Sequence, residues 1–147
     1  MVGAPLIRPG TTESLEFCVS SEDMEAFRRL SGDSNPLHHD HVLARRRGFK
    51  GVVVYGGLIV AQVSRLLGTV LPGPGCVWHA LRLRFRNPLY VGDRARLSGT
   101  VTYASDALGV VKLAVRVESA GRVIADGDVS AQLKNESRNA RAADAIR

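Results

Sequence analysis

A single long apolar segment, residues 56–71, constrains the fold of this chain more than any other feature. Arg65 is the only charged residue in it, and the apolar side chains surround the helix axis on almost every side. A helix of this kind has no face suited to water and is expected to be buried. Prolines and glycines at residues 72–75 end the segment. The sequence therefore predicts a central helix over residues 56–71 that is wrapped by a sheet.

The segments that follow alternate between apolar and other residues, as strands do. They span residues 77–87, 94–103, 108–118 and 122–133, with turn-forming pairs at 105–106 and 120–121. A weaker alternation at residues 14–19 predicts a strand near the start of the chain. One buried helix followed by consecutive antiparallel strands is typical of the α+β class, and no internal repeat is visible.

Two shorter helices are predicted before the central one. Ser20 or Ser21 can cap a helix that ends near residue 30, and Asp40 can cap another that ends near residue 47. The side chains expected to face inward are Met24, Phe27 and Leu30 in the first helix and Val42 and Leu43 in the second. The 147 residues suit one domain, which we place at 1–134. The polar, Ala-rich residues 135–147 are expected to form a flexible tail.

The segment before the central helix carries an acid and a base. Asp33 and His38 flank a turn at Asn35-Pro36, where the proline pushes Asn35 toward extended geometry. A carboxylate and an imidazole on such a loop can face one point and hold one water, an arrangement for proton transfer. A helix that begins at Gly56 would present free backbone N–H groups, which suit a developing oxyanion.

A longer pattern surrounds these residues. It reads Gly32-Asp33-x-Asn35-Pro36-Leu37-His38-x-Asp40, Phe49, Gly56-x-Leu58, Leu71-Pro72-Gly73 and Phe85-x-x-Pro88-x-x-x-Gly92-Asp93. The pattern, from about residue 27 to about residue 101, resembles the MaoC-like dehydratases, the R-specific enoyl-thioester hydratases of the hotdog fold. The resemblance implies a single hotdog domain in which Asp33 and His38 activate water and Gly56 binds the thioester oxygen. It also implies that no metal or redox cofactor is needed, since coenzyme A or phosphopantetheine arrives with the substrate.

Each of these residues also has a purely structural explanation. Asp33 can form an Asx turn, His38 can be a packed loop histidine, and Gly56 can allow a helix to approach a sheet closely. Asn35 is expected to fix the loop through its side chain. Ser64 stands where the family carries a serine in the site, and it could orient Asp33 or the water. Alternatively, Ser64 bonds back to its own helix.

Three positions depart from the family pattern. Tyr55 stands where members usually carry histidine, Gly57 where they usually carry methionine, and Val52 where they often carry proline. None of these changes removes the acid–base pair. The changes at Tyr55 and Gly57 alter the volume near the thioester, so they bear on the range of substrates more than on the reaction.

The net charge of +6 comes mostly from arginine, which suits phosphate or acidic partners. Arg82, Arg84 and Arg86 alternate with apolar residues in one predicted strand, and residues 45–47 are an arginine triplet. Either group could bind the phosphates of coenzyme A or of a carrier-protein arm. The alternative is that both are solvated surfaces.

Other functional classes have little support in the sequence. Aromatic residues make up only 5% and no nucleic-acid-binding motif is present, so we expect no nucleic acid partner. No segment is apolar enough to span a membrane, and no signal peptide is visible. Cys18 and Cys76 are expected to be small buried side chains in a reducing, cytoplasmic compartment. The histidines at residues 38–41 do not have the spacing of a zinc site, so we expect no metal.

The sequence thus predicts a homodimeric hydro-lyase that acts on acyl thioesters, with the site at the dimer interface as the resemblance implies. An acyl carrier protein or a second, different hotdog subunit is a possible partner. Two alternatives remain open: a hotdog thioesterase and a non-catalytic acyl-binding subunit. The predicted central helix contains no Asp or Glu, which speaks against the thioesterase.

Overall fold

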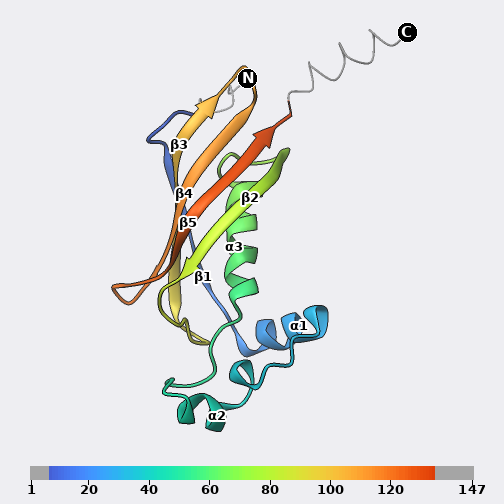
Figure 1. Cartoon of the computed structure of the whole chain (residues 1–147), viewed down its shortest axis with the longest axis vertical. Coiled ribbons are helices and arrows are strands. Elements are labelled where there is room, and N and C mark those ends of the chain that lie inside the picture. Colours follow the sequence, from blue (N-terminus) through green and yellow to red (C-terminus); the bar gives the residue numbers. More distant parts are fainter. Residues whose placement is uncertain (1–6, 135–147) are drawn as a thin grey trace, which may run out of the picture.

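The structure, a computed structural model, describes residues 7–134, and it consists of one antiparallel sheet with a long helix against it (Figure 1). The strands are β1 (Thr12–Cys18), β2 (Cys76–Phe85), β3 (Arg94–Ser105), β4 (Val110–Ser119) and β5 (Arg122–Leu133). The helices are α1 (Ser21–Ser31), the 3-10 turn η1 (Pro36–His38), α2 (His41–Arg46) and α3 (Gly56–Thr69). The predicted α+β arrangement is confirmed.

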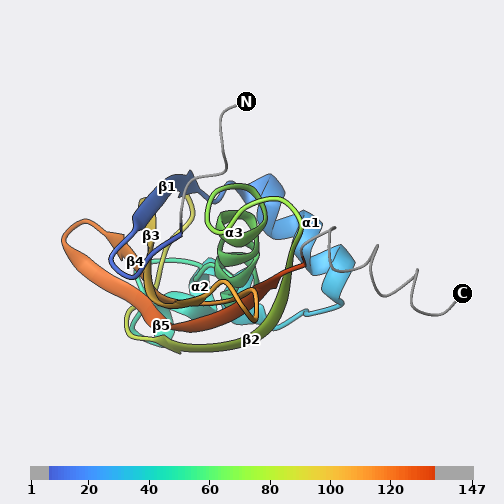
Figure 2. The ribbon, with the colours of Figure 1, turned by 90° about the horizontal axis from the view of Figure 1, so that it is seen from above.

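The sheet has the strand order β1-β3-β4-β5-β2 and curves around α3, as the view from above shows (Figure 2). Strands β3, β4 and β5 form the expected meander. The β4–β5 hairpin turns at Ala120 and Gly121, whose φ angles of 50° and 73° match the right-handed twist of the strands. β2, however, pairs with β5 and not with β3, its neighbour in sequence. β2 is therefore an edge strand.

The central helix is buried on one side only. Ile59, Val63, Leu66 and Leu67 lie against the sheet and are at most 2% exposed. The opposite side is exposed at its small residues, which are Gly57, Ala61, Ser64 and Gly68. The expectation of burial all round is wrong for the part of the chain that the structure describes, because one sheet covers one face of a helix and residues 7–134 form no second layer beyond it.

The two short helices begin at their predicted caps. The Ser20 hydroxyl accepts the Asp23 N–H at 3.1 Å, and the Asp40 carboxylate accepts the Val42 N–H at 2.9 Å. Two residues that the sequence predicts to face inward, Leu30 and Val42, are exposed instead. Leu30 is 86% exposed. Three residues of a helix complete a full turn less about 60°, so the two steps of three residues from Met24 to Leu30 place Leu30 on a different face of the helix.

Val42 is also exposed, at 59%, and Ala44 is the residue of α2 that is fully buried. Cys18 was expected to be buried but is exposed, since the alternation of β1 turns its neighbours Leu15 and Phe17 inward. Cys76 is half-buried, and its Sγ donates to the Leu67 carbonyl at 3.2 Å.

The residues described do not test the predicted domain range of 1–134, and the predicted tail at 135–147 lies outside them. Within residues 7–134, the helices are all too short or too polar to cross a bilayer.

Candidate active site

The loop between α1 and η1 is held by hydrogen bonds from its own polar side chains. The Asp33 N–H donates to the Ser31 hydroxyl at 3.1 Å, and Asp33 Oδ1 accepts the Asn35 N–H at 3.0 Å. Asn35 Oδ1 in turn accepts the Leu37 N–H at 3.1 Å and so caps η1. Asn35 thus fixes the loop, as its position in the motif predicts. Asp33 forms the Asx turn that was its structural explanation, while its second oxygen bonds no group among residues 7–134.

His38 is anchored by one ring nitrogen. Its Nδ1 lies 2.6 Å from the carbonyl oxygen of Val53, which can only accept a hydrogen bond. Nδ1 therefore carries the hydrogen, and in the neutral ring Nε2 is left with the free lone pair. A backbone hydrogen bond joins the same parts of the chain: the Val53 N–H donates to the carbonyl of Leu37, the residue before His38, at 3.2 Å. Together these two hydrogen bonds to Val53 fix the plane of the His38 imidazole.

Tyr55 connects His38 with Asp33. Its ring stacks on the imidazole, with centroids 4.1 Å apart, and its hydroxyl donates to the Asp33 carbonyl oxygen at 2.8 Å. Tyr55 is 2% exposed, and this burial raises the pKa of its hydroxyl; the nearby Asp33 charge raises it further. Sequence reasoning noted Tyr55 only as a departure from the family. The residue type alone could not show that the Tyr55 hydroxyl would bind the loop that carries Asp33.

His38 and Gly56 line one pocket of about 340 Å³. Its other walls include Phe49, Ile59 and Phe85. A Cβ on Gly56 would lie 3.0 Å from Cζ of Phe85, so this glycine lets the β2 end approach the first turn of α3. The pocket thus combines an imidazole, a helix N-terminus and an apolar wall. Asp33 does not line it: this residue is exposed, and its backbone carbonyl, not its carboxylate, is tied to the site by the Tyr55 hydroxyl.

A notch at Gly57 is filled by an aromatic ring. A Cβ at Gly57 would lie 2.3 Å from Cζ of Phe27. The Phe27 ring packs in turn on Tyr55, with centroids 4.8 Å apart. Gly57 is therefore matched by Phe27, and their contact holds α1 against the start of α3 beside the site.

The weaker predicted site residues lie farther out. Arg82 pairs with Asp128 at 2.6 Å and Arg86 with Asp126 at 3.1 Å, on the sheet face that points away from α3. Arg84 lines the same outer face, and these contacts favour the solvated-surface interpretation. Arg86 also reaches the edge of the His38 pocket. Ser64 is exposed on the outer side of α3 and does not line this pocket.

Comparisons with known proteins agree with this geometry. Residues 7–122 match the family model described as MaoC like domain. The chain is 32% identical over 124 residues to the "(R)-specific enoyl-CoA hydratase" of Rhodospirillum rubrum, covering 84% of this chain and 86% of that one. It is 33% identical over 119 residues to the "3-hydroxybutyryl-CoA dehydratase" of Methylorubrum extorquens, covering 81% and 76%.

Among solved structures, the (R)-hydratase from A. caviae involved in PHA biosynthesis superposes with a TM-score of 0.83 at 30% identity. The match covers 89% of this chain and all of that one. These matches confirm the hotdog fold. The half-wrapped helix, the Asp33–His38 loop and the extent of the family match together show that this chain belongs to the MaoC-like domain family.

Proposed function

We propose that the protein adds water reversibly to trans-2-enoyl thioesters and so forms (3R)-hydroxyacyl thioesters. One observation supports this most directly: His38, oriented by the Val53 carbonyl, shares a pocket with the N-terminus of α3 at Gly56. A base and an oxyanion site side by side are what addition to a polarised double bond needs. The relatives named as hydratase and dehydratase support the same reaction.

In this proposal His38 Nε2 takes a proton from water while the water oxygen bonds to C3 of the enoyl group. Backbone N–H groups at the start of α3 stabilise the negative charge that develops on the thioester oxygen. A proton is then delivered to C2, so one water is added in total and nothing is oxidised or reduced. In this proposal Asp33 accepts a hydrogen bond from the water, and the proton that His38 took is returned from Nε2 to C2. No metal or redox cofactor enters these steps.

The site is completed, in our proposal, by a second copy of the chain. The exposed small residues Ala61, Ser64 and Gly68 along α3 leave room for another helix, and the β2 edge exposes Val77 at 40% and Phe85 at 54%. An unpaired strand edge with exposed apolar residues is suited to pairing with another chain. Phe85 of this edge and Gly56 at the start of α3 line the His38 pocket, so a partner would enclose it. A homodimer in the cytoplasm is our proposal, and a different hotdog subunit is the alternative.

The test is hydration of crotonyl-CoA by the full chain and by the variants His38→Ala and Asp33→Asn. Loss of the base or of the group that holds water should lower kcat by about 10²- to 10⁴-fold. Asp106→Asn, at an exposed position in the β3–β4 turn away from the pocket and the β2 edge, is the matched control and should keep full activity. Circular dichroism checks that each variant is folded. Full activity in His38→Ala would refute the assignment.

The same assay separates the alternative functions. A thiol reagent added to the reaction reports free coenzyme A, which a thioesterase would release and a hydratase would not. Saturable binding of enoyl-CoA without any turnover, across several chain lengths, would indicate the non-catalytic acyl-binding subunit. A parallel series with enoyl groups on an acyl carrier protein shows which carrier is preferred.

A further inference from the structure

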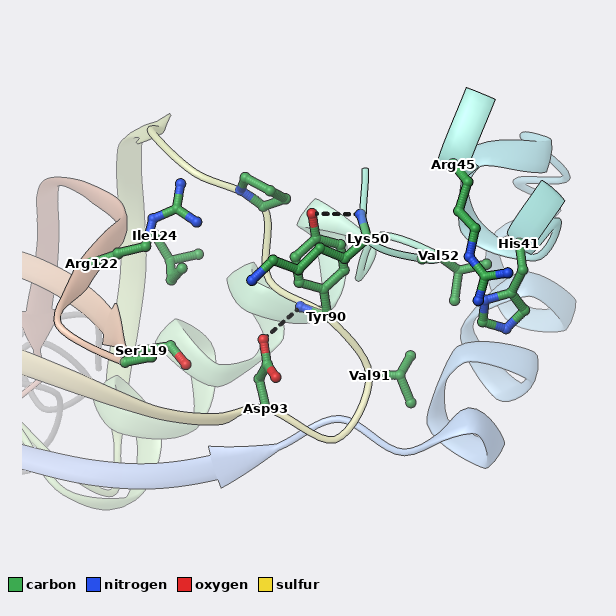
Figure 3. A pocket seen from close by; sticks show the side chains of 13 residues that line it. His41, Arg45, Lys50, Val52, Tyr90, Val91, Asp93, Ser119, Arg122 and Ile124 are labelled. Atoms are coloured by element: carbon green, nitrogen blue, oxygen red, sulfur yellow. Dashed lines mark hydrogen bonds between the residues drawn. The ribbon is translucent and has the colours of Figure 1, made fainter. Parts of the chain in front are cut away.

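A second pocket, of about 440 Å³, lies beside the candidate active site and is drawn in Figure 3. It is formed between α2, the segment before Val52, the β2–β3 connection and the β4–β5 turn. Pro88 lines both this pocket and the pocket that contains His38, so the two are neighbours across the β2–β3 connection. The reaction proposed above uses none of the other residues that line it.

The walls of this pocket carry an excess of positive charge. Arg45, Lys50 and Arg122 line it, with Asp93 as the carboxylate among the described lining residues. In Figure 3, Arg45 lies at one side with His41, Arg122 lies at the opposite side, and Lys50 extends between them.

These cations lack ionic partners of their own. The ion pairs found within residues 7–134 are made by other arginines, so Arg45, Lys50 and Arg122 are not neutralised by a carboxylate in that part of the chain. The Arg122 guanidinium donates to the neutral amide oxygen of Asn87. Asp93 already accepts the Tyr90 N–H at 3.3 Å. An anion that enters the pocket would therefore meet uncompensated positive charge.

The floor of the pocket is apolar and includes an aromatic ring. Val52 and Ile124 are buried, and Tyr90 is half-buried with its hydroxyl accepting the Lys50 N–H at 3.2 Å. Figure 3 shows the Tyr90 ring at the centre of the pocket, beneath Lys50. A flat, apolar ring system could lie on such a floor while phosphates meet the cations at the rim. A nucleotide has both parts, whereas a free phosphate would leave the floor unused.

We propose that this pocket binds the phosphorylated nucleotide end of a coenzyme A thioester. The inference deepens the proposed function, on which it rests for the identity of the substrate. The flexible pantetheine chain would lead from the nucleotide past Pro88 to the thioester beside His38 and Gly56. The pocket would then favour coenzyme A over carriers that lack the nucleotide.

The test compares two substrates that differ only at that end: crotonyl-CoA, and crotonyl-pantetheine, which has no phosphate. In the variant Arg45→Glu/Lys50→Glu, the KM for crotonyl-CoA should rise about tenfold or more, the effect expected when charge-assisted hydrogen bonds are lost. The KM for crotonyl-pantetheine and both kcat values should stay within twofold of the parent. Arg47→Glu is the matched control, since it reverses a neighbouring exposed charge that does not line the pocket.

A binding measurement on the full chain separates this inference from the proposed reaction. Adenosine 3′,5′-bisphosphate, titrated calorimetrically, should bind the parent and Arg47→Glu but at least tenfold more weakly to the double variant. If neither thioester is hydrated but this difference in binding is seen, the reaction is wrong and the nucleotide site stands. Equal binding to parent and double variant, or an equal rise in KM for both substrates, would overturn the site.

Discussion

The imidazole of His38 lies stacked on the ring of Tyr55, with centroids 4.1 Å apart and planes inclined by 29°. The Tyr55 hydroxyl at the same time holds the carbonyl of Asp33. One buried side chain therefore positions both residues of the proposed acid–base pair. Tyr55 acts through these neighbours, and its two contacts can be removed one at a time.

Tyr55→Phe keeps the stacked ring and removes the hydroxyl. The Asp33 carbonyl loses its donor, so we expect a loss of about 1 kcal/mol in the free energy of unfolding, measured by urea denaturation. The hydration kcat should fall severalfold with KM nearly unchanged, because the loop that carries Asp33 loosens while the imidazole stays in place. Tyr55→Leu, which removes the ring as well, should lower kcat further. If Tyr55→Phe and Tyr55→Leu lose the same activity, stacking does not position His38.

Gly57 and Phe27 should be energetically coupled. Gly57→Met drives a side chain into the space that the Phe27 ring occupies. Overpacking of this kind costs about 1–3 kcal/mol of stability. Phe27→Ala/Gly57→Met should recover part of that cost, with a coupling of about 0.5–3 kcal/mol in a double-mutant cycle from urea denaturation. Strict additivity of the two substitutions would contradict the fit of Phe27 into the glycine notch.

The start of α1 should weaken in acid. The Ser20 backbone N–H donates to Asp23 Oδ2 at 2.8 Å, and this bond together with the Ser20 hydroxyl lowers the pKa of the Asp23 carboxyl below its ordinary 3.8. A lowered pKa in the folded state adds stability above pH 3.8, and that stability is lost as the pH falls through the folded value.

Asp23→Asn should therefore be less stable than the parent by about 0.5–1 kcal/mol near neutral pH. The difference should shrink toward zero well below pH 3.8, because the parent carboxyl is then protonated as well. Urea denaturation of both proteins across this range measures the difference. A gap that does not change with pH would show that the Asp23 charge contributes nothing.

Ala61→Arg tests whether the exposed side of α3 is an interface. The Ala61 side chain points away from the sheet, so a single folded chain tolerates arginine there. In a dimer that covers this face, the arginine would be buried without a partner and the chains should separate. Sedimentation equilibrium should give the mass of a dimer for the parent and the mass of a single chain for the variant. Ala107→Arg, in the exposed β3–β4 turn, is the control and should keep the parent mass.

Several features could be predicted from the sequence because they depend on residues close together in the chain. Ser20 and Asp40 cap their helices through bonds to N–H groups two or three residues away. The Asx turn at Asp33 and the β4–β5 hairpin at Gly121 are equally local. Alternation also predicted β5 at its observed bounds. These interactions exist in any conformation that brings a few neighbouring residues together, so the sequence by itself determined them.

Other features were decided only by contacts between distant parts of the chain. The apolar composition of α3 could not show that one sheet would leave a side of it exposed, and local alternation could not place β2 beside β5. The stacking of Tyr55 on His38 and the wedge of Phe27 at Gly57 likewise join segments that only the folded core brings together. Long-range packing selects such pairs by shape and volume, which a pattern of neighbouring residues does not encode.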